Sequence, residues 1–324
     1  MRAPSGSPRY CYVSDDPNTH ANNLQGWSQL YDQLSVGSFQ GEITGACFSG
    51  IHLFRETTSL SLRQSCVVLS HSWWFGIPAS ETGSFRIDAR RIGEGAIAIR
   101  RGNRPFELIT PTGFRIFGLV VHHKTLAAHL RSVFPEEDAL VRLSLDTSQS
   151  NLHSHGALSE FFGEVLDEVG RRPEILESAK ACQAIQNSLL DAVTEICASS
   201  QQAREIPRSE VQYAQLVRKV RQFLMDNSDR AISVPELCTA FQVSRRTLQY
   251  AFDRVIGMGP NAYLKILRLN GVRRDLMRRD KNISIQQAAS DWGFWHLSQF
   301  AKDYRTLFRE LPSATMKRAE RFSC

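Results

Sequence analysis

The sequence predicts an α+β protein. An N-terminal cupin-like β-barrel or sandwich with helices precedes an all-α domain that contains two helix-turn-helix units. Three observations support this prediction: short apolar runs as far as His122, helical spacing of apolar residues from Leu126 onward, and a repeated helix-start signal near the C-terminus. The length of 324 residues is about twice that of a typical domain and agrees with two domains.

The region from Trp27 to His122 is built of short apolar runs that turn residues interrupt. The runs are 38–48, 51–54, 66–69, 73–77, 85–87, 96–99, 106–109 and 114–121. Runs of this length and spacing are typical of an antiparallel sandwich or barrel. Farther along, residues 158–169 and 185–196 have apolar side chains at helical spacing, which predicts two amphipathic helices.

Composition changes along the chain predict four segments. Residues 1–26 are expected to be a flexible tail, and residues 27–200 a domain for sensing and dimerisation. Residues 201–212 are polar, contain Pro207 and are expected to be a linker, and residues 213–324 form the helical domain.

Charge is divided unequally between the two ends of the chain. Residues 211–324 contain 20 Lys+Arg and 10 Asp+Glu, whereas the remainder contains 19 and 23. A basic excess confined to one domain favours binding of double-stranded DNA by that domain. The polar first thirty residues and the lack of a long apolar run predict a cytoplasmic protein without a membrane partner.

Two matching helix-start signals lie 51 residues apart. Ser233–Glu236 and Ser284–Gln287 both fit the capping-box pattern, and a second helix follows each after a short turn. Those second helices align with an offset of 52, for example Leu248 with Phe300, so we expect the extra residue near Gly293 in the second turn. The repeat indicates two helix-turn-helix units joined by a long helix over 261–279.

The second helix of each unit is the predicted DNA-reading helix, because its polar side chains remain exposed once the apolar face is buried. In the first unit the candidates are Arg245, Arg246, Gln249 and Tyr250, and in the second they are His296, Ser298, Gln299, Lys302 and Arg305. Leu297 fits either the core or contact with a thymine methyl. We expect the first unit to supply more of the base specificity.

Four segments resemble the AraC/XylS family of bacterial regulators: SRRTLQYAF (244–252), GMGPNAYLK (257–265), RLNGVRRDL (268–276) and WGFWHLSQFAKDY (292–304). The resemblance implies a transcription regulator that binds promoter DNA, acts on RNA polymerase, responds to a small-molecule effector and can form a homodimer. The sequence departs from the family at Glu310, where glycine is frequent, and at Cys238, where alanine is usual.

A second resemblance covers residues 31–42, 53–66 and 73–79. These segments are similar to activators of ethanolamine-utilisation operons. The resemblance implies an activator of ethanolamine or related amine catabolism, with ethanolamine and adenosylcobalamin as effectors and no required cofactor.

An effector pocket is expected in the N-terminal domain. Its candidate residues combine aromatic walls with polar anchors: Phe54, Arg55, Glu56, Arg63, Gln64, Trp73, Trp74 and Phe75. The alternative is that these aromatic residues only fill the sandwich core. Adjacent His122 and His123 in a strand would point to opposite faces, so we expect no metal site.

Enzymatic function is the main alternative from another class. A DNA-repair alkyltransferase with this type of DNA-binding domain needs an activated or clustered cysteine, and the seven cysteines here are scattered. A metal-dependent barrel enzyme needs histidines that alternate on one strand. An architectural DNA-bending protein would be basic throughout. We therefore predict a regulator that is not an enzyme and has no catalytic residues.

Overall fold

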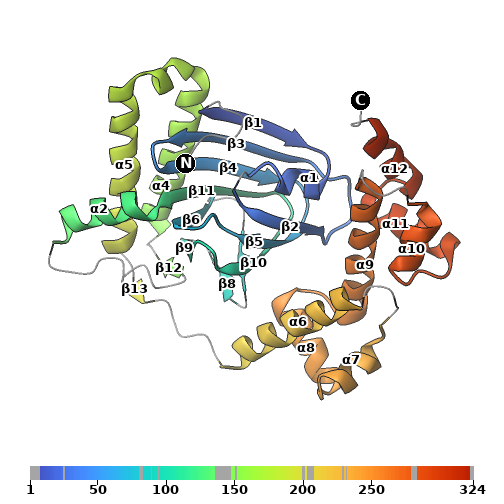
Figure 1. Ribbon diagram of the computed structural model, residues 1–324. Helices are drawn as coiled ribbons and strands as arrows, with labels where there is room; N and C mark the ends of the chain where they lie inside the picture. The colour runs from blue at the N-terminus through green and yellow to red at the C-terminus, as the bar shows by residue number, and fades with distance from the viewer. Residues whose placement is uncertain are drawn as a thin grey trace. The chain divides into compact units, whose positions relative to one another are not determined.

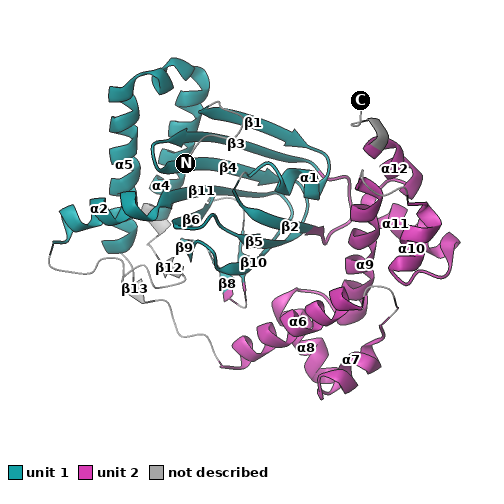
Figure 2. Cartoon of the chain, in the orientation of Figure 1, with its two compact units in different colours: residues 1–31, 40–87, 91–205 teal, residues 32–39, 88–90, 206–324 magenta. Residues whose placement is uncertain are grey.

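The computed structural model describes residues 8–24, 26–79, 83–88, 90–93, 95–135, 147–149, 152–198, 201–202, 208–227, 230, 232–278 and 283–321. The chain forms two compact units, which Figure 2 colours separately. Unit 1 contains residues 1–31, 40–87 and 91–205, and unit 2 contains residues 32–39, 88–90 and 206–324. Sheets in the N-terminal part and helices in the C-terminal part confirm the predicted α+β class.

Two β-sheets provide most of the strands (Figure 1). The larger sheet has the order β1 (Arg9–Ser14), β3 (Gly41–Phe48), β4 (Ile51–Thr58), β11 (Phe114–His122), β6 (Ser72–Pro78), β9 (Ala96–Arg101), β12 (Thr147–Gln149), β13 (Gln201–Gln202). The smaller has the order β2 (Ser28–Gln33), β5 (Leu62–Val67), β10 (Pro105–Thr110), β7 (Phe85–Ile87), β8 (Arg90–Ile92). Each predicted apolar run overlaps one of these strands.

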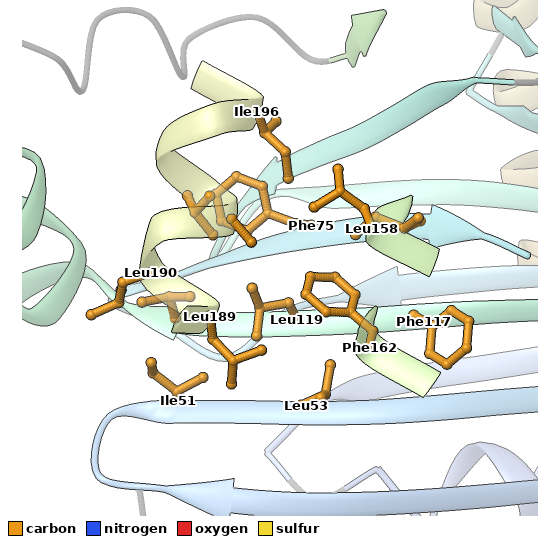
Figure 3. Close-up of a cluster of buried hydrophobic side chains, with 14 of the residues drawn as sticks. Ile51, Leu53, Phe75, Phe117, Leu119, Leu158, Phe162, Leu189, Leu190 and Ile196 are labelled. Atoms are coloured by element: carbon orange, nitrogen blue, oxygen red, sulfur yellow. The ribbon is translucent and has the colours of Figure 1, made fainter. Parts of the chain in front are cut away.

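One face of the larger sheet packs against two helices, α4 (Leu152–Arg171) and α5 (Ala179–Ala198). Alternate residues of each strand point to this face because side chains alternate along a strand. The buried cluster that results is shown in Figure 3 and includes Ile51, Leu53, Phe75, Phe117, Leu119, Leu158, Phe162, Leu189, Leu190 and Ile196. Both predicted amphipathic helices are therefore present, and they cover the sheet. Unit 1 also contains helix α2 (His123–Val133) and the 3-10 helix η2 (Pro173–Glu177).

The predicted flexible tail over residues 1–26 is wrong for its described part. β1 pairs antiparallel with β3, and helix α1 (Pro17–Ala21) follows it. The Asp16 side chain accepts hydrogen bonds from the backbone N–H groups of Asn18 and Thr19, which caps α1. These elements are too short for their periodicity to stand out in the sequence, and residues 1–7 lie outside the described residues.

The predicted linker over residues 201–212 is also too long. Helix α6 (Arg208–Asp226) begins inside it, because the polar residues from Arg208 form the helix's first turn rather than a coil. Val217, Val220 and Leu224 form the buried stripe of α6 farther along. Residues 203–207 lie outside the described residues.

Unit 2 contains seven helices in its described part. After α6 come α7 (Val234–Ala240), α8 (Arg245–Val255), α9 (Pro260–Met277), α10 (Ile285–Asp291), α11 (Leu297–Phe308) and α12 (Pro312–Arg321). The predicted long helix is α9, within two residues at either end. No helix in the described ranges is long and apolar enough to cross a membrane.

The short segment Asp32–Phe39 belongs to unit 2 although it comes from the N-terminal part of the sequence. Gln33 and Asn270 of α9 exchange hydrogen bonds: the Gln33 N–H donates to Asn270 Oδ1 at 2.9 Å, and Asn270 Nδ2 donates to the Gln33 carbonyl at 3.0 Å. Arg274 Nη1 lies 2.5 Å from Asp32 Oδ1. Distant sequence segments therefore share the core of the helical unit.

Candidate DNA-binding interface and effector site

The first helix-turn-helix unit consists of α7 and α8 and begins with a complete capping box. The Ser233 hydroxyl accepts from the Glu236 N–H, and the Glu236 carboxylate accepts from the Ser233 N–H at 2.8 Å. The turn after α7 uses Gln242 in the left-handed region, with φ of 52°. Ser244 then caps α8 by accepting from the Thr247 N–H at 3.0 Å. The predicted start signals at Ser233 and Ser244 are therefore confirmed.

The second unit, α10 and α11, has only half of the predicted capping box. The Ser284 hydroxyl accepts from the Gln287 N–H at 3.1 Å, but the Gln287 amide donates forward to Asp291 instead of returning to Ser284. Gly293, with φ of 72°, occupies the left-handed position of the turn. His296 precedes α11 as its N-cap and makes no side-chain capping hydrogen bond.

Backbone hydrogen bonds show where the two units fall out of register. The Val243 N–H donates to the Cys238 carbonyl at 3.0 Å, and the Phe294 N–H donates to the Ala289 carbonyl at 2.9 Å, which is an offset of 51 residues. The reading helices begin after Ser244 and His296, an offset of 52. The extra residue is therefore Trp295, two residues beyond the position expected at Gly293.

The apolar faces of the two reading helices are buried as predicted. In α8 these residues are Leu248, Ala251, Phe252 and Val255, and in α11 they are Phe300, Tyr304, Leu307 and Phe308. Burial of these faces leaves all nine predicted DNA-contact residues exposed: Arg245, Arg246, Gln249, Tyr250, His296, Ser298, Gln299, Lys302 and Arg305. Their contact with DNA remains a prediction.

Local contacts orient several of the predicted reading side chains. The Arg246 guanidinium lies 5.6 Å from the centre of the Tyr250 ring, a cation–π distance. The Gln249 amide donates to Asp253, and the Gln299 amide donates to Asp303, each acceptor being four residues farther along the same helix. These bonds use the amide nitrogen of each glutamine, and the Oε1 atom can still accept a hydrogen bond from a base.

A buried polar cluster supports the second unit and involves Glu310, the residue that departs from the family pattern. Its carboxylate bonds Arg273 of α9 and Arg318 of α12, and it accepts from the Thr315 hydroxyl at 2.7 Å. Arg309, rather than residue 310, takes the left-handed backbone conformation, with φ of 59°. Glycine is therefore not needed at 310, and the helix end keeps its geometry.

Two arginines of α9, Arg273 and Arg274, have largely buried side chains. The Arg273 side chain is 4% exposed, and that of Arg274 is 11% exposed. Their acidic partners, Glu310 and Asp32, are distant in the sequence, so no local pattern indicated this burial. Trp292 also packs here: its indole N–H donates to Asp275 at 2.7 Å, and its ring leaves no room for a Cβ at Gly271.

The C-terminal region matches known proteins over about a third of this chain. A family model described as a helix-turn-helix domain matches residues 237–318. The XylDLEGF operon transcriptional activator of Pseudomonas putida is 36% identical over 104 residues, which is 32% of each chain. XylDLEGF operon transcriptional activator 2 from the same species is 39% identical over 30% of this chain and 63% of its own length.

A solved structure is also similar in this region. It is described as a probable AraC family transcriptional regulator from Rhodopseudomonas palustris, with 34% identity over 32% of this chain and 97% of that chain, at a TM-score of 0.30. The C-terminal region is thus similar to helix-turn-helix transcription regulators over about a third of the chain. These relatives are transcription regulators rather than enzymes, and the match spans about a third of the length of the first XylDLEGF activator.

In the N-terminal part of the chain, strand alternation divides the predicted effector residues between different faces. Trp73 and Phe75 belong to the cluster beneath α4 and α5, and Arg55 pairs with Asp167 of α4 at 3.1 Å. The prediction that these three line a pocket with the others is wrong. Phe54, Glu56 and Trp74 point to the opposite face of the larger sheet, because they alternate with those residues.

Arg63 and Gln64 are neighbours on β5 and so point to opposite faces. Arg63 Nε donates to Glu107 Oε1 at 2.5 Å, so this arginine is held by a strand neighbour. Gln64 shares a face with Cys66, and Gln29 Nε2 donates to the Cys66 sulfur at 3.6 Å. Of the eight predicted effector residues, Phe54, Glu56, Gln64 and Trp74 remain as candidates.

Glu56 is the centre of a buried polar cluster that the sequence did not reveal. Its Oε1 accepts from the Tyr31 hydroxyl at 2.9 Å and lies 3.1 Å from His20 Nε2. Burial, and then the nearby Glu56 carboxylate, raise the pKa of Tyr31 well above its usual value. His20 lies in the predicted tail and Tyr31 precedes the first predicted apolar run, so only the fold brings them to Glu56.

Four aromatic rings line the same face: Trp27, Phe54, Trp74 and Phe106. Trp74 stacks on Phe106 with centroids 5.2 Å apart, and Trp27 meets Trp74 edge-on at 5.8 Å. The Phe54 ring packs directly against Gly118, and a Cβ atom on residue 118 would overlap the ring. Among the described residues, the buried indole N–H of Trp74 has no hydrogen-bond acceptor. Trp27 is half-buried, so the cluster reaches the surface at this ring.

The histidines considered for a metal site occupy separate local roles. His122 ends β11 and accepts from the Lys124 N–H, whereas His123 starts α2, so the two do not continue one strand as assumed. His129 lies 3.1 Å from the Thr194 hydroxyl. Across the described ranges, no three His, Cys, Asp or Glu side chains are placed to hold a metal ion.

Proposed function

We propose that this chain is a transcription activator that binds promoter DNA through both helix-turn-helix units and responds to a small organic amine. The observation that carries the DNA-binding part is the pair of reading helices, each with a buried apolar face and an exposed polar one, in a basic domain. The matched relatives are named as operon activators, which supports positive regulation.

The Glu56 cluster supports an amine as the effector. A carboxylate attracts an ammonium group, and faces of aromatic rings attract it further by cation–π interaction. Glu56, Phe54 and Trp74 lie on one face of the larger sheet, and the Trp74 N–H is free to donate to a ligand hydroxyl or carbonyl. The sequence resemblance names ethanolamine, which carries both an ammonium and a hydroxyl, and adenosylcobalamin as a second effector.

Effector binding would change promoter affinity or polymerase recruitment by favouring one state of the regulator. Recruitment of RNA polymerase in the cytoplasm and formation of a homodimer are parts of this proposal. Sedimentation of the full chain with and without effector tests the dimer, and transcription with purified polymerase tests recruitment.

The DNA-binding proposal is tested by selecting bound sequences from a random duplex library. We expect the full chain to enrich a defined site, with two half-sites about one helical turn apart if both units read the same face of DNA. Enrichment of no sequence would contradict sequence-specific binding.

The effector proposal is tested by calorimetry with ethanolamine and with adenosylcobalamin, each with and without the selected DNA. Propanol, a neutral analogue of similar size, is the ligand control. Glu56→Gln should abolish ethanolamine binding, whereas Glu42→Gln, at an exposed position of β3, should not. Absence of heat and of any change in DNA affinity with both compounds would contradict this part of the proposal.

A further inference from the structure

Trp295 is the one residue that the second helix-turn-helix unit has in addition to the first. The turn position Phe294 corresponds to Val243, and the N-cap His296 corresponds to Ser244, so Trp295 has no counterpart. The insertion falls directly before the reading helix α11. A large aromatic residue has therefore been added at the end of the helix that the DNA-binding proposal places nearest the bases.

The Trp295 side chain is 68% exposed, and Leu297, two residues later, is 42% exposed. Exposed apolar groups of this size gain stability from being covered, and their clustering marks binding surfaces. In the described part of residues 206–324, the other large apolar side chains with such exposure are Val211, Tyr250 and Leu311. Three of these five thus lie on a reading helix or immediately before it.

The chemistry of the major groove supplies an apolar partner for these side chains. The thymine 5-methyl is the apolar group that base edges present there, and N-terminal residues of a reading helix are the ones that reach base edges. The exposed side chains farther along α11, such as Lys302 and Arg305, are cationic and suit phosphates. The exposed surface of α11 is thus apolar at the N-terminal end and basic farther along, which fits DNA. A helix that binds in a groove of another protein would be expected to have apolar exposed residues along more of its length.

We propose that Trp295, together with Leu297, recognises thymine methyl groups in the major groove and so determines part of the base specificity of the second unit. The inference rests on the proposed DNA-binding function. The first unit was expected to supply more of the base specificity. With these contacts the second unit would also select bases, through apolar contact with thymine methyl groups.

The test removes single methyl groups from the selected DNA site. Each thymine of the site is replaced in turn by deoxyuridine, which lacks the 5-methyl and keeps the base-pairing edge. We expect wild-type affinity to fall about fourfold at one or two thymines, the effect of about one buried methyl group. Trp295→Ala should bind the unmodified site more weakly and show no further loss at those same thymines.

Two variants serve as controls for this loss of methyl sensitivity. Leu311→Ala removes another exposed apolar side chain, which lies beyond the end of α11, and should keep wild-type affinity and methyl sensitivity. Lys302→Ala should weaken binding while the methyl sensitivity remains. Circular dichroism of Trp295→Ala checks its folding, and Trp295→Phe should recover part of the sensitivity if the Ala variant is less stable.

The results of these experiments distinguish failure of the thymine-methyl inference from failure of the DNA-binding proposal on which it rests. Methyl sensitivity that persists in both Trp295→Ala and Leu297→Ala would overturn the inference while leaving DNA binding intact. Unchanged DNA affinity with reduced transcription by purified polymerase would also overturn it and assign Trp295 to a protein contact. Failure of the wild-type chain to select any DNA would overturn the proposed function itself.

Discussion

The first helix-turn-helix unit presents arginine, glutamine and tyrosine on α8, whereas the second presents histidine, serine, glutamine and two apolar side chains around the start of α11. Both use the same frame: a serine-capped first helix, a left-handed residue in the turn, and an aromatic or leucine core on the second helix. The two units thus share the serine cap of the first helix, the left-handed turn residue and the buried core, whereas the exposed side chains of their reading helices differ. Repetition of a fold element does not imply repetition of what it recognises.

The two units also differ in what holds them. The first depends on local capping, since Ser233, Glu236 and Ser244 all cap through residues near in sequence. The second lacks a side-chain cap on α11 and is held by the buried Glu310 cluster, which joins α9 to α12. Substitutions of the capping residues should therefore affect the first unit, and substitutions in the Glu310 cluster should affect the second. This difference can be tested by measuring the stability of variants.

The largest expected effect is on the long-range support. Glu310→Ala removes the carboxylate shared by two poorly exposed arginines and should lower the free energy of unfolding by about 3 kcal/mol. Urea unfolding measures this loss. The control is Asp253→Ala on exposed α8, where a change within about 0.5 kcal/mol is expected. An equally small effect at Glu310 would show that the second unit does not depend on this cluster.

The next effect concerns base recognition by the first unit. Arg246→Ala should weaken binding to the selected site by about 1 to 3 kcal/mol and relax selection at one base position. Arg305→Ala in the second unit should weaken binding to all sequences alike and reduce the salt dependence by about one phosphate contact. Repeating the library selection with each variant measures both. Relaxed selection by Arg305→Ala alone would reverse the assignment.

The sequence predicted those parts of the molecule that depend on neighbouring residues. Strand β4 was found from Ile51–Phe54 because its alternation is local, and the capping box at Ser233 was found because its partners are three residues apart. The Ser284 box is incomplete because the Gln287 amide turns to donate to Asp291, one turn farther on, so its oxygen does not accept from the Ser284 N–H. The pattern of residues was correct, but a competing hydrogen bond decided the geometry.

The candidate sites were predicted less completely because they depend on partners distant in sequence. Trp73 and Trp74 look equivalent in the sequence, but only the position of α4 and α5 decides which of them is covered. The partners of Glu56 and Arg273 are likewise remote. The inserted residue was easier to predict. The distance between corresponding residues of the two units changes from 51 to 52, and this change is visible in the sequence. The backbone hydrogen bonds were needed only to identify the inserted residue as Trp295.

A smaller effect is expected at the N-caps of the two reading helices. Ser244→Ala removes the hydrogen bond to the Thr247 N–H and should cost about 1 kcal/mol of stability. His296→Ala removes no capping bond and should cost little, whereas His296→Ser should gain stability because serine can cap α11. Urea unfolding of the three variants provides the measurement. Equal losses for both alanine variants would mean that α11 has a cap in solution.

The smallest expected effect is a pH dependence confined to the first unit. The Ser233 N–H, followed by Arg230 and the Ser233 hydroxyl, lowers the pKa of Glu236 to about 2. Because this pKa lies below that of the unfolded chain, near 4.5, ionised Glu236 stabilises the unit above that pH and loses its contribution as the pH falls toward about 2. The second unit has the uncharged Gln287 at the corresponding position.

Glu236→Gln therefore gives the first unit the same residue type that the second unit has at the corresponding position, Gln287. Wild type should unfold at a higher urea concentration than Glu236→Gln near neutral pH, and the difference should shrink as the solution is acidified below about pH 4.5. Gln287→Glu should introduce the same dependence into the second unit if its side chain turns back to Ser284. If it does not, the backbone of this turn keeps residue 287 away from the Ser284 N–H even without the hydrogen bond to Asp291, and the two units differ in helix geometry as well as in charge.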